Sequence, residues 1–351
     1  MNKDTPQPFT RRHRGTGPTV KDVARLAGVS PMTVSRAINA SCSIRPETQA
    51  KVEEAVRELG YVPNRAARSL AGGRQSRIAL VHSNPSAGYR RELLVGAVAQ
   101  ANASNVQLSI EQWEKGDTVA QFVARQKAHQ IDGILLPPPL CEDAALIHAL
   151  HSARIRIVQI SPSLPNPLAH ALTIEDINAA RAITAHLVEL GHVRIGFIEG
   201  SATQSQSALR RAGYETALRE AGIALEPDLI VPGDFSYRSG LVATERLLAI
   251  PHQPTAIFAS NDEMAAAAVA IVHRHRLDVP TDISVCGFDD TAMATTIWPE
   301  LTTIRQPIAK MAKAGIKLLC RSSDAQADEP RLYCLPVELI VRASSGPPSA
   351  D

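Results

Sequence analysis

A stretch close to the N-terminus, residues 19 to 28, repeats apolar residues at the spacing of an amphipathic helix. The apolar stripe consists of Val20, Val23, Ala24 and Ala27. Thr19 is followed three residues later by Asp22, and this pair can start the helix in the manner of a capping box. Gly28 then has the backbone freedom that a tight turn requires. The pattern predicts a short helix that ends in a turn.

Two further helices are predicted after this turn. Ser30 is a suitable N-cap for the second helix, and Pro31 fits its first position, where the missing N–H costs nothing. The side chains expected to face inward are Val34, Ala37 and Ile38, and those left facing outward are Met32, Thr33, Ser35 and Arg36. The third helix should run from Pro46 to Gly60, with a buried side made of Ala50, Val52, Val56 and Leu59. Such a layout is typical of a helix-turn-helix that reads DNA.

From residue 78 the pattern changes to short apolar strands that alternate with amphipathic helices. The expected strands are 78–83, 106–110, 131–136, 155–160, 194–199, 255–260 and 283–288. This order predicts an α/β fold with parallel sheets covered on both faces. Because the strands are too many for one ordinary sheet, we expect two similar lobes. The first comprises about 78–174 and 305–323, and the second about 175–304 and 330–345, with a return crossover at 300–307.

Charge is distributed unevenly along the chain of 351 residues, although its net charge is only +2. Residues 1–77 contain 14 Lys or Arg against 6 Asp or Glu, a net charge of +8, and the remainder has 23 against 29, a net charge of −6. A basic head suits a module that neutralises phosphates. The chain has no apolar run of about 18 residues that could span a membrane and no export signal. Its five cysteines lack metal-ligand spacing, so we expect reduced thiols in the cytoplasm and neither metal nor cofactor.

Three segments closely resemble the N-terminus of the LacI/GalR family of transcription regulators: TVKDVARLAGVSPMTVSRAIN, then GYVPN, then RAARSLAGGRQ. The resemblance extends over nearly the whole chain from Thr19. It implies a disordered basic tail (1–18), a helix-turn-helix domain (19–63), a hinge helix and linker (64–77), and an effector-binding and dimerisation domain (78–351). That last domain would resemble the two-lobed periplasmic binding proteins.

The resemblance also implies how the DNA end works. With the second helix in the major groove, Pro31 and Met32 would make apolar contacts and Arg36 could bond a guanine, while Thr33 and Ser35 position phosphates. Met32 departs from members with a hydrogen-bonding side chain there, which suggests recognition of thymine methyl groups. The positions implied to contact DNA are Thr19, Ser30, Pro31, Met32, Thr33, Ser35, Arg36, Asn39, Tyr61, Asn64, Arg65, Ala67 and Leu70.

The octet from Asn64 to Ala71 is too short to be a stable helix alone and should fold on DNA. In the family, two such hinges pair in the minor groove and a leucine wedges between base steps; the matching residue is Leu70, with Arg65 and Arg68 near phosphates. Hinge pairing predicts a homodimer on a pseudo-palindromic operator. The C-terminal VRASSGPPSAD has no heptads that would build a tetramer.

Ligands of such sheets bind where the strands end, in a cleft that two lobes can close. Family motifs place effector contacts at Tyr89, Glu175, Arg210, Phe235, Asn261, Asp289 and Gln306. Two of these positions depart from the family pattern: Glu175 and Asp176 replace the family's usual Asp-Asn pair, and the residues around Tyr89 differ. The arginine's fork can bind vicinal hydroxyls or a carboxylate, and an aromatic ring suits an apolar sugar face.

These expectations together predict a sequence-specific regulator, a repressor of carbohydrate-utilisation genes controlled by a sugar, an oligosaccharide or a sugar acid, with purines as a minority alternative. Two other classes compete. A sugar-binding transport receptor would share residues 78–342 but would need an export signal and would lack residues 19–77. An enzyme could use Asp289 with Asp290, or Asp262 with Glu263, but adjacent residues on a strand-end loop usually point apart, which disfavours catalysis. The direction of the effector's influence on DNA binding stays open.

Overall fold

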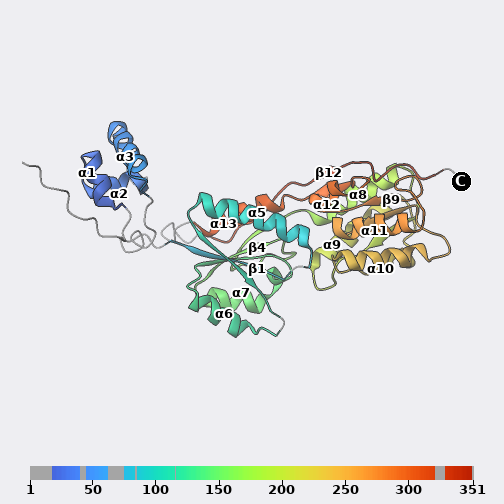
Figure 1. Cartoon of the computed structure of the whole chain (residues 1–351). Coiled ribbons are helices and arrows are strands. Elements are labelled where there is room, and N and C mark those ends of the chain that lie inside the picture. Colours follow the sequence, from blue (N-terminus) through green and yellow to red (C-terminus); the bar gives the residue numbers. More distant parts are fainter. Residues whose placement is uncertain are drawn as a thin grey trace, which may run out of the picture. The chain divides into compact units, whose positions relative to one another are not determined.

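The computed structural model describes residues 18–39, 45–61, 75–83, 85–114, 116–320 and 329–349. The chain forms two compact units, Met1–Gln75 and Ser76–Asp351 (Figure 1). The division falls just before the first strand of the α/β region.

The first unit contains three helices, α1 (Val20–Ala27), α2 (Pro31–Asn39) and α3 (Pro46–Leu59). The capping box at α1 forms: the Asp22 carboxylate accepts hydrogen bonds from the Thr19 backbone N at 3.0 Å and from its Oγ1 at 2.7 Å. The buried core consists of Val23, Ala24, Val34, Ala37, Val52, Ala55 and Tyr61. Ala50 was expected in this core but is exposed, because the buried side of α3 follows Val52 at a spacing of three and four residues.

A six-stranded parallel sheet forms the first lobe of the second unit, in the order β11-β5-β4-β3-β1-β2. Its strands are β1 (Arg77–His82), β2 (Gln107–Gln112), β3 (Gly133–Leu136), β4 (Arg156–Ile160), β5 (His170–Thr173) and β11 (Leu332–Cys334). Helices α5 (Ala87–Ala103) and α13 (Ile308–Leu319) pack together on one face. The other face carries α6 (Val119–Ala128) and α7 (Ala144–Ser152), below the sheet in Figure 1. A short 3-10 helix, η1 (Leu140–Glu142), precedes α7.

The second lobe is built on a four-stranded parallel sheet, β7-β6-β8-β9. Its strands are β6 (Ile195–Ile198), β7 (Ile230–Val231), β8 (Ala256–Ala259) and β9 (Ser284–Cys286). Two helix pairs cover it, α8 (Asp176–Glu189) with α9 (Ser205–Glu220), and α10 (Tyr237–Leu248) with α11 (Asp262–Arg274). The short η2 (Pro227–Leu229) and α12 (Ala292–Thr296) complete the lobe. All seven strands predicted from the apolar runs are present, and so is the predicted α/β class with parallel sheets.

The chain passes between the lobes at three adjacent places. Two short strands, β10 (Thr303–Arg305) and β12 (Glu338–Ile340), pair antiparallel at these passages. The segment 330–345, expected in the second lobe, is divided between the two. Its β11 extends the first lobe's sheet by pairing with β5, whose edge is otherwise open. The later Ser344 returns to the second lobe, where its hydroxyl donates a hydrogen bond of 2.5 Å to the carbonyl of Val285.

Candidate effector site and DNA-reading helix

The outward face of α2 has the character expected of a recognition helix. Met32 is 65% exposed, and Pro31 and Arg36 are exposed as well. Thr33 and Ser35 are half-buried. Ser30 Oγ accepts a hydrogen bond from the Thr33 backbone N at 3.1 Å, so Ser30 is used as the helix cap. This face therefore offers a methionine and an arginine on a helix whose start is fixed.

Other positions expected at the DNA differ in their surroundings. Thr19 is exposed at the start of α1, whereas Tyr61 is 7% exposed and packs in the three-helix core, which leaves little of its side chain for DNA. The side chain of Asn39 lies outside the described part of the chain. The same holds for the hinge positions Asn64, Arg65, Ala67, Arg68 and Leu70.

A cavity lies between the two lobes, where strands of both sheets end. Its lining residues are Ser86, Tyr89, Pro138, Ser161, Gln204, Gln206, Arg210, Phe235, Asn261, Asp289 and Gln306. Six of the seven residues expected at the effector site are among them. The enclosed volume is about 20 Å³, within about 320 Å³ of unfilled space that opens to solvent. Since one water needs roughly 10–15 Å³ of such enclosed volume, a ligand of several carbons fits only when the walls move apart.

Arg210, on α9, is held in the cavity wall by three neighbours. Its Nε donates a hydrogen bond to Asp176 Oδ1 at 2.9 Å, and its Nη1 donates to the carbonyl of Ser260 at 2.6 Å. Its guanidinium carbon lies 3.6 Å from the centroid of the Phe288 ring. Arg210 itself is only 4% exposed. Its position is therefore set before any ligand binds.

Asp289 follows β9 and joins the second lobe to the crossover. Its backbone N donates to the carbonyl of Ile304 at 2.8 Å, and the backbone N of Gln306 donates to the Asp289 carbonyl at 3.2 Å. The Gln306 Nε2 also donates to Asp289 Oδ1 at 2.6 Å. Asp289 Oδ1 lies 3.7 Å from Arg210 Nη1. Asp289 and Gln306, both expected to contact the ligand, are thus hydrogen-bonded to each other at the crossover between the lobes.

Phe235 presents its ring to the cavity from the loop before α10. Its backbone has φ 70°, and its carbonyl accepts a hydrogen bond from Asn261 Nδ2 at 2.9 Å. Asn261 also caps α11, because its Oδ1 accepts from the Met264 backbone N at 3.0 Å. The ring lies against Gly200, where an added Cβ would be 2.0 Å from Phe235 Cζ. Asn261 and Gly200 therefore hold the aromatic plate in place.

Comparison with known proteins assigns this arrangement to a family. Residues 19–64 match the family described as "Bacterial regulatory proteins, lacI family", and residues 184–345 match the "Periplasmic binding protein-like domain". The chain is 34% identical over 334 residues to the HTH-type transcriptional regulator DegA of Bacillus subtilis (strain 168), covering 94% of this chain and 98% of DegA. The chain belongs to the lacI family. It is a DNA-binding transcriptional regulator and not an enzyme.

Solved structures of lacI-family regulators share this fold over nearly the full chain. A complex of the regulator CelR with cellobiose has a TM-score of 0.71 at 31% identity and covers 93% of this chain and 99% of its own. The lac repressor dimer bound to operator and the anti-inducer ONPF has a TM-score of 0.74 at 29% identity, with 94% and 100% covered. CelR of Thermobifida fusca is also 33% identical in sequence over 341 residues, or 95% of this chain and 99% of CelR.

Glu175 is the one expected effector residue that this lacI-family chain places outside the cavity. It is exposed at the start of α8, where Cys334 Sγ lies 3.6 Å from its Oε1. The next residue, Asp176, is 4% exposed and binds Arg210. Glu175 therefore lies outside the cavity lining, because the helix begins after it and turns Asp176, not Glu175, inward toward Arg210.

Five cavity residues were missed from the sequence: Ser86, Pro138, Ser161, Gln204 and Gln206. Ser161 directly follows β4, and Pro138 follows β3 by two residues. Ligands of such sheets bind where the strands end, and this expectation, which selected Asn261 and Asp289, also applies to these two positions. The two glutamines lie on the loop after β6 and at the start of α9. These side chains are uncharged and non-aromatic, so their chemistry alone did not distinguish them from other loop residues as ligand contacts.

Side chains bridge the two lobes at the rim of the cavity. Glu263, on α11, accepts hydrogen bonds from the Gly88 backbone N at 2.7 Å and from Ser86 Oγ at 3.3 Å, so it caps α5 of the opposite lobe. Gln206 of the second lobe donates to the carbonyl of Ser161 in the first. These contacts stabilise the closed arrangement of the lobes.

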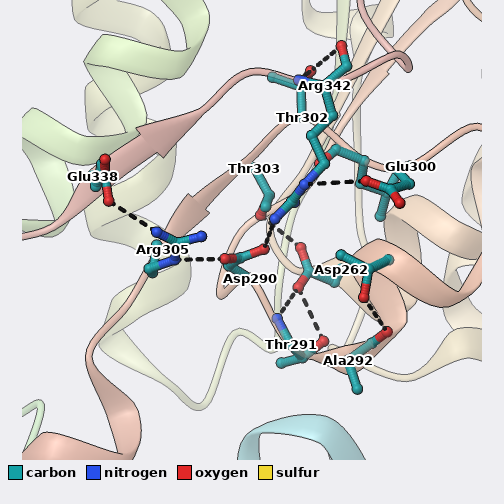
Figure 2. A network of polar contacts seen from close by, with 12 residues as sticks. Asp262, Asp290, Thr291, Ala292, Glu300, Thr302, Thr303, Arg305, Glu338 and Arg342 are labelled. Carbon is teal, nitrogen blue, oxygen red and sulfur yellow. Dashed lines mark hydrogen bonds and ion pairs between the residues drawn. The ribbon is translucent and has the colours of Figure 1, made fainter.

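A second polar network holds the crossover strands to the second lobe (Figure 2). The two oxygens of Asp290 accept from Arg305 Nε and Arg342 Nη2, each at 2.7 Å. Arg305 also bonds Glu338 on β12 at 3.0 Å. Asp290 thus points toward the crossovers while Asp289 points into the cavity. The expectation that these adjacent carboxylates diverge is confirmed, and no paired acid and base results.

Burial raises the pKa of the carboxyl groups around Arg210. It raises the pKa of Asp289 to about 7, although Arg210 and the hydrogen bond from Gln306 oppose the shift. It raises the pKa of Asp262 to about 8, with the charge of Asp289 adding to the effect. It also raises the pKa of Asp176, against the attraction of Arg210. The cluster is therefore rich in acid groups that are costly to ionise.

Within the described ranges, no group of His, Cys, Asp and Glu has a geometry that could hold a metal ion. In the same part of the chain, none of the helices is both long and apolar enough to cross a membrane.

Proposed function

We propose that this lacI-family regulator represses carbohydrate-utilisation genes and that a sugar bound between its lobes controls its affinity for operator DNA. The observation that carries the proposal is the cavity: an aromatic plate, a fixed guanidinium, a carboxylate and amides converge at strand ends. This combination suits a ring with an apolar face and several hydroxyl groups. The CelR–cellobiose complex supports the same class of ligand.

The proposed control of DNA binding depends on an equilibrium between two arrangements of the lobes. A ligand that binds one lobe arrangement better than the other shifts their equilibrium by its differential affinity. Since Asp289 and Gln306 are bonded at the crossover, a ligand contact there acts on the segment that connects the lobes. Couplings of roughly 1 to 3 kcal/mol would change operator affinity about 5- to 150-fold.

The DNA-bound form is proposed to be a homodimer in the cytoplasm, on a pseudo-palindromic operator. The lac repressor relative was solved as a dimer bound to operator, and a two-fold protein matches a two-fold site. The residues proposed at base edges are Pro31, Met32 and Arg36, which are exposed on one helix. Leu70 is proposed as the minor-groove wedge of the hinge.

Fluorescence anisotropy tests this function directly. The full-length protein is titrated onto a labelled duplex from its own upstream region at fixed salt, with and without a panel of sugars. We expect saturable binding that depends on the palindrome and is shifted by one sugar. A protein that binds no upstream duplex in preference to random DNA would contradict the regulator; binding that no sugar shifts would contradict the effector class.

A further inference from the structure

The cavity wall contains one basic side chain among the described residues, and its charge is already neutralised. Arg210 contacts Asp176 at 2.9 Å and Asp289 at 3.7 Å. Its Nη1 donates to the carbonyl of Ser260, and its face lies on the Phe288 ring. The guanidinium is therefore committed to groups of the protein on several sides and offers little free charge to a ligand.

Acidic groups outnumber this base in the surrounding shell. Four carboxyl side chains are almost fully buried there, with exposed fractions of 4% for Asp176, 1% for Asp262, 8% for Glu263 and 5% for Asp289. Asp262 accepts hydrogen bonds from Thr291 and Thr303, and Glu263 caps the facing helix α5. Because burial raises the pKa of Asp262 to about 8 and that of Asp289 to about 7, these carboxyls are only partly ionised at neutral pH; a further negative charge would be repelled by those that are ionised, in a site of low dielectric constant.

One neutral oxygen atom of the wall, Gln206 Oε1, has no hydrogen-bond partner within the described residues, whereas the nearby Tyr89 OH and Ser161 Oγ lie close enough to pair with each other. They belong to side chains that are each at least 94% buried and line the cavity. Gln206 Oε1 can only accept, as can an ionised Asp289. A partner for these two groups must donate hydrogen bonds. Hydroxyl groups do so, whereas a carboxylate or phosphate does not at neutral pH.

We infer that the cavity selects an uncharged, hydroxyl-rich ligand and rejects the acid or phosphate of the same sugar. Asp176 is the specificity-determining residue, since it takes up the charge of Arg210 that an anionic ligand would need. The inference rests on the proposed function, because it treats this cavity as the effector site. It narrows that function to neutral sugars and polyols.

Calorimetric titration of the full-length protein with matched ligand pairs tests the inference. The panel comprises pentoses, hexoses and disaccharides, each beside its uronic acid and its phosphate; glucose, glucuronate and glucose phosphate form one such set. We expect the neutral member of the binding set to be at least about tenfold tighter. A tighter acid or phosphate would overturn the inference while supporting a sugar effector. Binding of no member would overturn the proposed function and the inference with it.

A substitution separates the role of Asp176 from that of the cavity shape. Asp176→Asn keeps an oxygen for Arg210 Nε but removes the charge, and we expect the preference for the neutral sugar to fall by about tenfold. The matched control, Asp228→Asn, removes an exposed carboxylate of the same lobe. It should leave unchanged the ratio of the affinity for the neutral sugar to the affinity for its acid or phosphate. Should Asp176→Asn fail to fold, Glu263→Gln removes one charge of the shell and should lower the ratio in the same direction. An unchanged ratio in a folded variant contradicts the role of the acid shell.

Discussion

At the scale of single residues, the effector site works because its polar groups are positioned by one another. Arg210 is fixed by Asp176, Asn261 holds the Phe235 carbonyl, and Gln306 holds Asp289. Each such bond removes rotamer freedom that a ligand would otherwise have to remove on binding. A ligand therefore meets a largely preformed surface once the walls separate.

The contact between Gly200 and Phe235 gives the first prediction. Because a Cβ at position 200 would lie 2.0 Å from Phe235 Cζ, Gly200→Ala should displace the ring, lower sugar affinity by more than about tenfold and cost about 1–3 kcal/mol of stability. Calorimetry and urea unfolding measure the two effects. As a control, Gly222→Ala introduces strain at φ 70° in open space and should reduce stability without changing affinity. Normal affinity in Gly200→Ala would mean that the ring is not part of the site.

A pH dependence of stability follows from Asp289. Its pKa in the folded protein is raised to about 7, so between about pH 4 and 7 the folded state holds a proton that the unfolded state has lost. Stability should therefore fall as pH rises, by up to about 1.4 kcal/mol per pH unit, and Asp289→Asn should flatten this fall. Urea unfolding at a series of pH values measures the difference between the two proteins. The difference is needed because other groups titrate as well: burial raises the pKa of Asp262 and Asp176, which acts in the same direction, and lowers the pKa of His186 and His192, which acts in the opposite direction. If the stability of the wild type and that of Asp289→Asn changed with pH in parallel, the raised pKa of Asp289 would be contradicted.

Met32 offers a prediction about base reading. If its exposed side chain contacts a thymine methyl, replacing that thymine by uracil should weaken operator binding of the wild type by about 1 kcal/mol, and should have no effect on Met32→Ala. Anisotropy with the two duplexes measures both. Equal sensitivity of the two proteins to uracil would exclude Met32 as the reader.

Much of the site could be predicted from single residues, and the exceptions have local causes. Asn261 and Asp289 were found because polar residues directly follow apolar strands. The inward turn of Asp176 instead of Glu175 depends on where α8 begins, which a pattern locates only to within a residue or two. Gln206 was missed because its role depends on a facing carbonyl from another lobe, at Ser161.

At the scale of elements, the lobes are joined by helix ends and short strands. Strands that lie in apolar runs were predicted from the sequence, and these include the three-residue β9 inside the run 283–288. The equally short β10, β11 and β12 each include or adjoin polar residues, and three residues are too few for an alternation to be visible. The pairing of β11 with β5 depends on an open sheet edge, a property of the assembled lobe. For this reason the path of the chain after α13 could not be derived from the pattern.

The cap that Glu263 places on α5 predicts how the lobes respond to its loss. Glu263→Ala removes a charge-assisted hydrogen bond between lobes, of a kind worth about 1.5–3 kcal/mol, and so favours the open arrangement. Since a ligand fits only when the cavity walls move apart, the apparent affinity for sugar should rise, by up to about tenfold, and the radius of gyration measured by X-ray scattering should rise as well. Glu220→Ala, which breaks an exposed ion pair within one lobe, is the control and should change neither quantity. An unchanged radius and affinity in Glu263→Ala would exclude this contact as a latch.

At the scale of the whole molecule, the basic N-terminal segment and the acidic remainder of the chain have different physical tasks, and their binding reactions should respond differently to salt. Residues 1–77 carry a net charge of +8, so operator binding should release counterions and weaken by about a thousandfold or more between about 50 and 200 mM salt. The effector cavity, if it takes an uncharged ligand between buried groups, should bind its sugar with nearly constant affinity over the same range. Anisotropy on operator DNA and calorimetry with sugar, in the same buffers, measure both. A sugar affinity that falls steeply with salt would instead indicate an anionic ligand held by free positive charge, which Arg210, paired on two sides, is not arranged to supply.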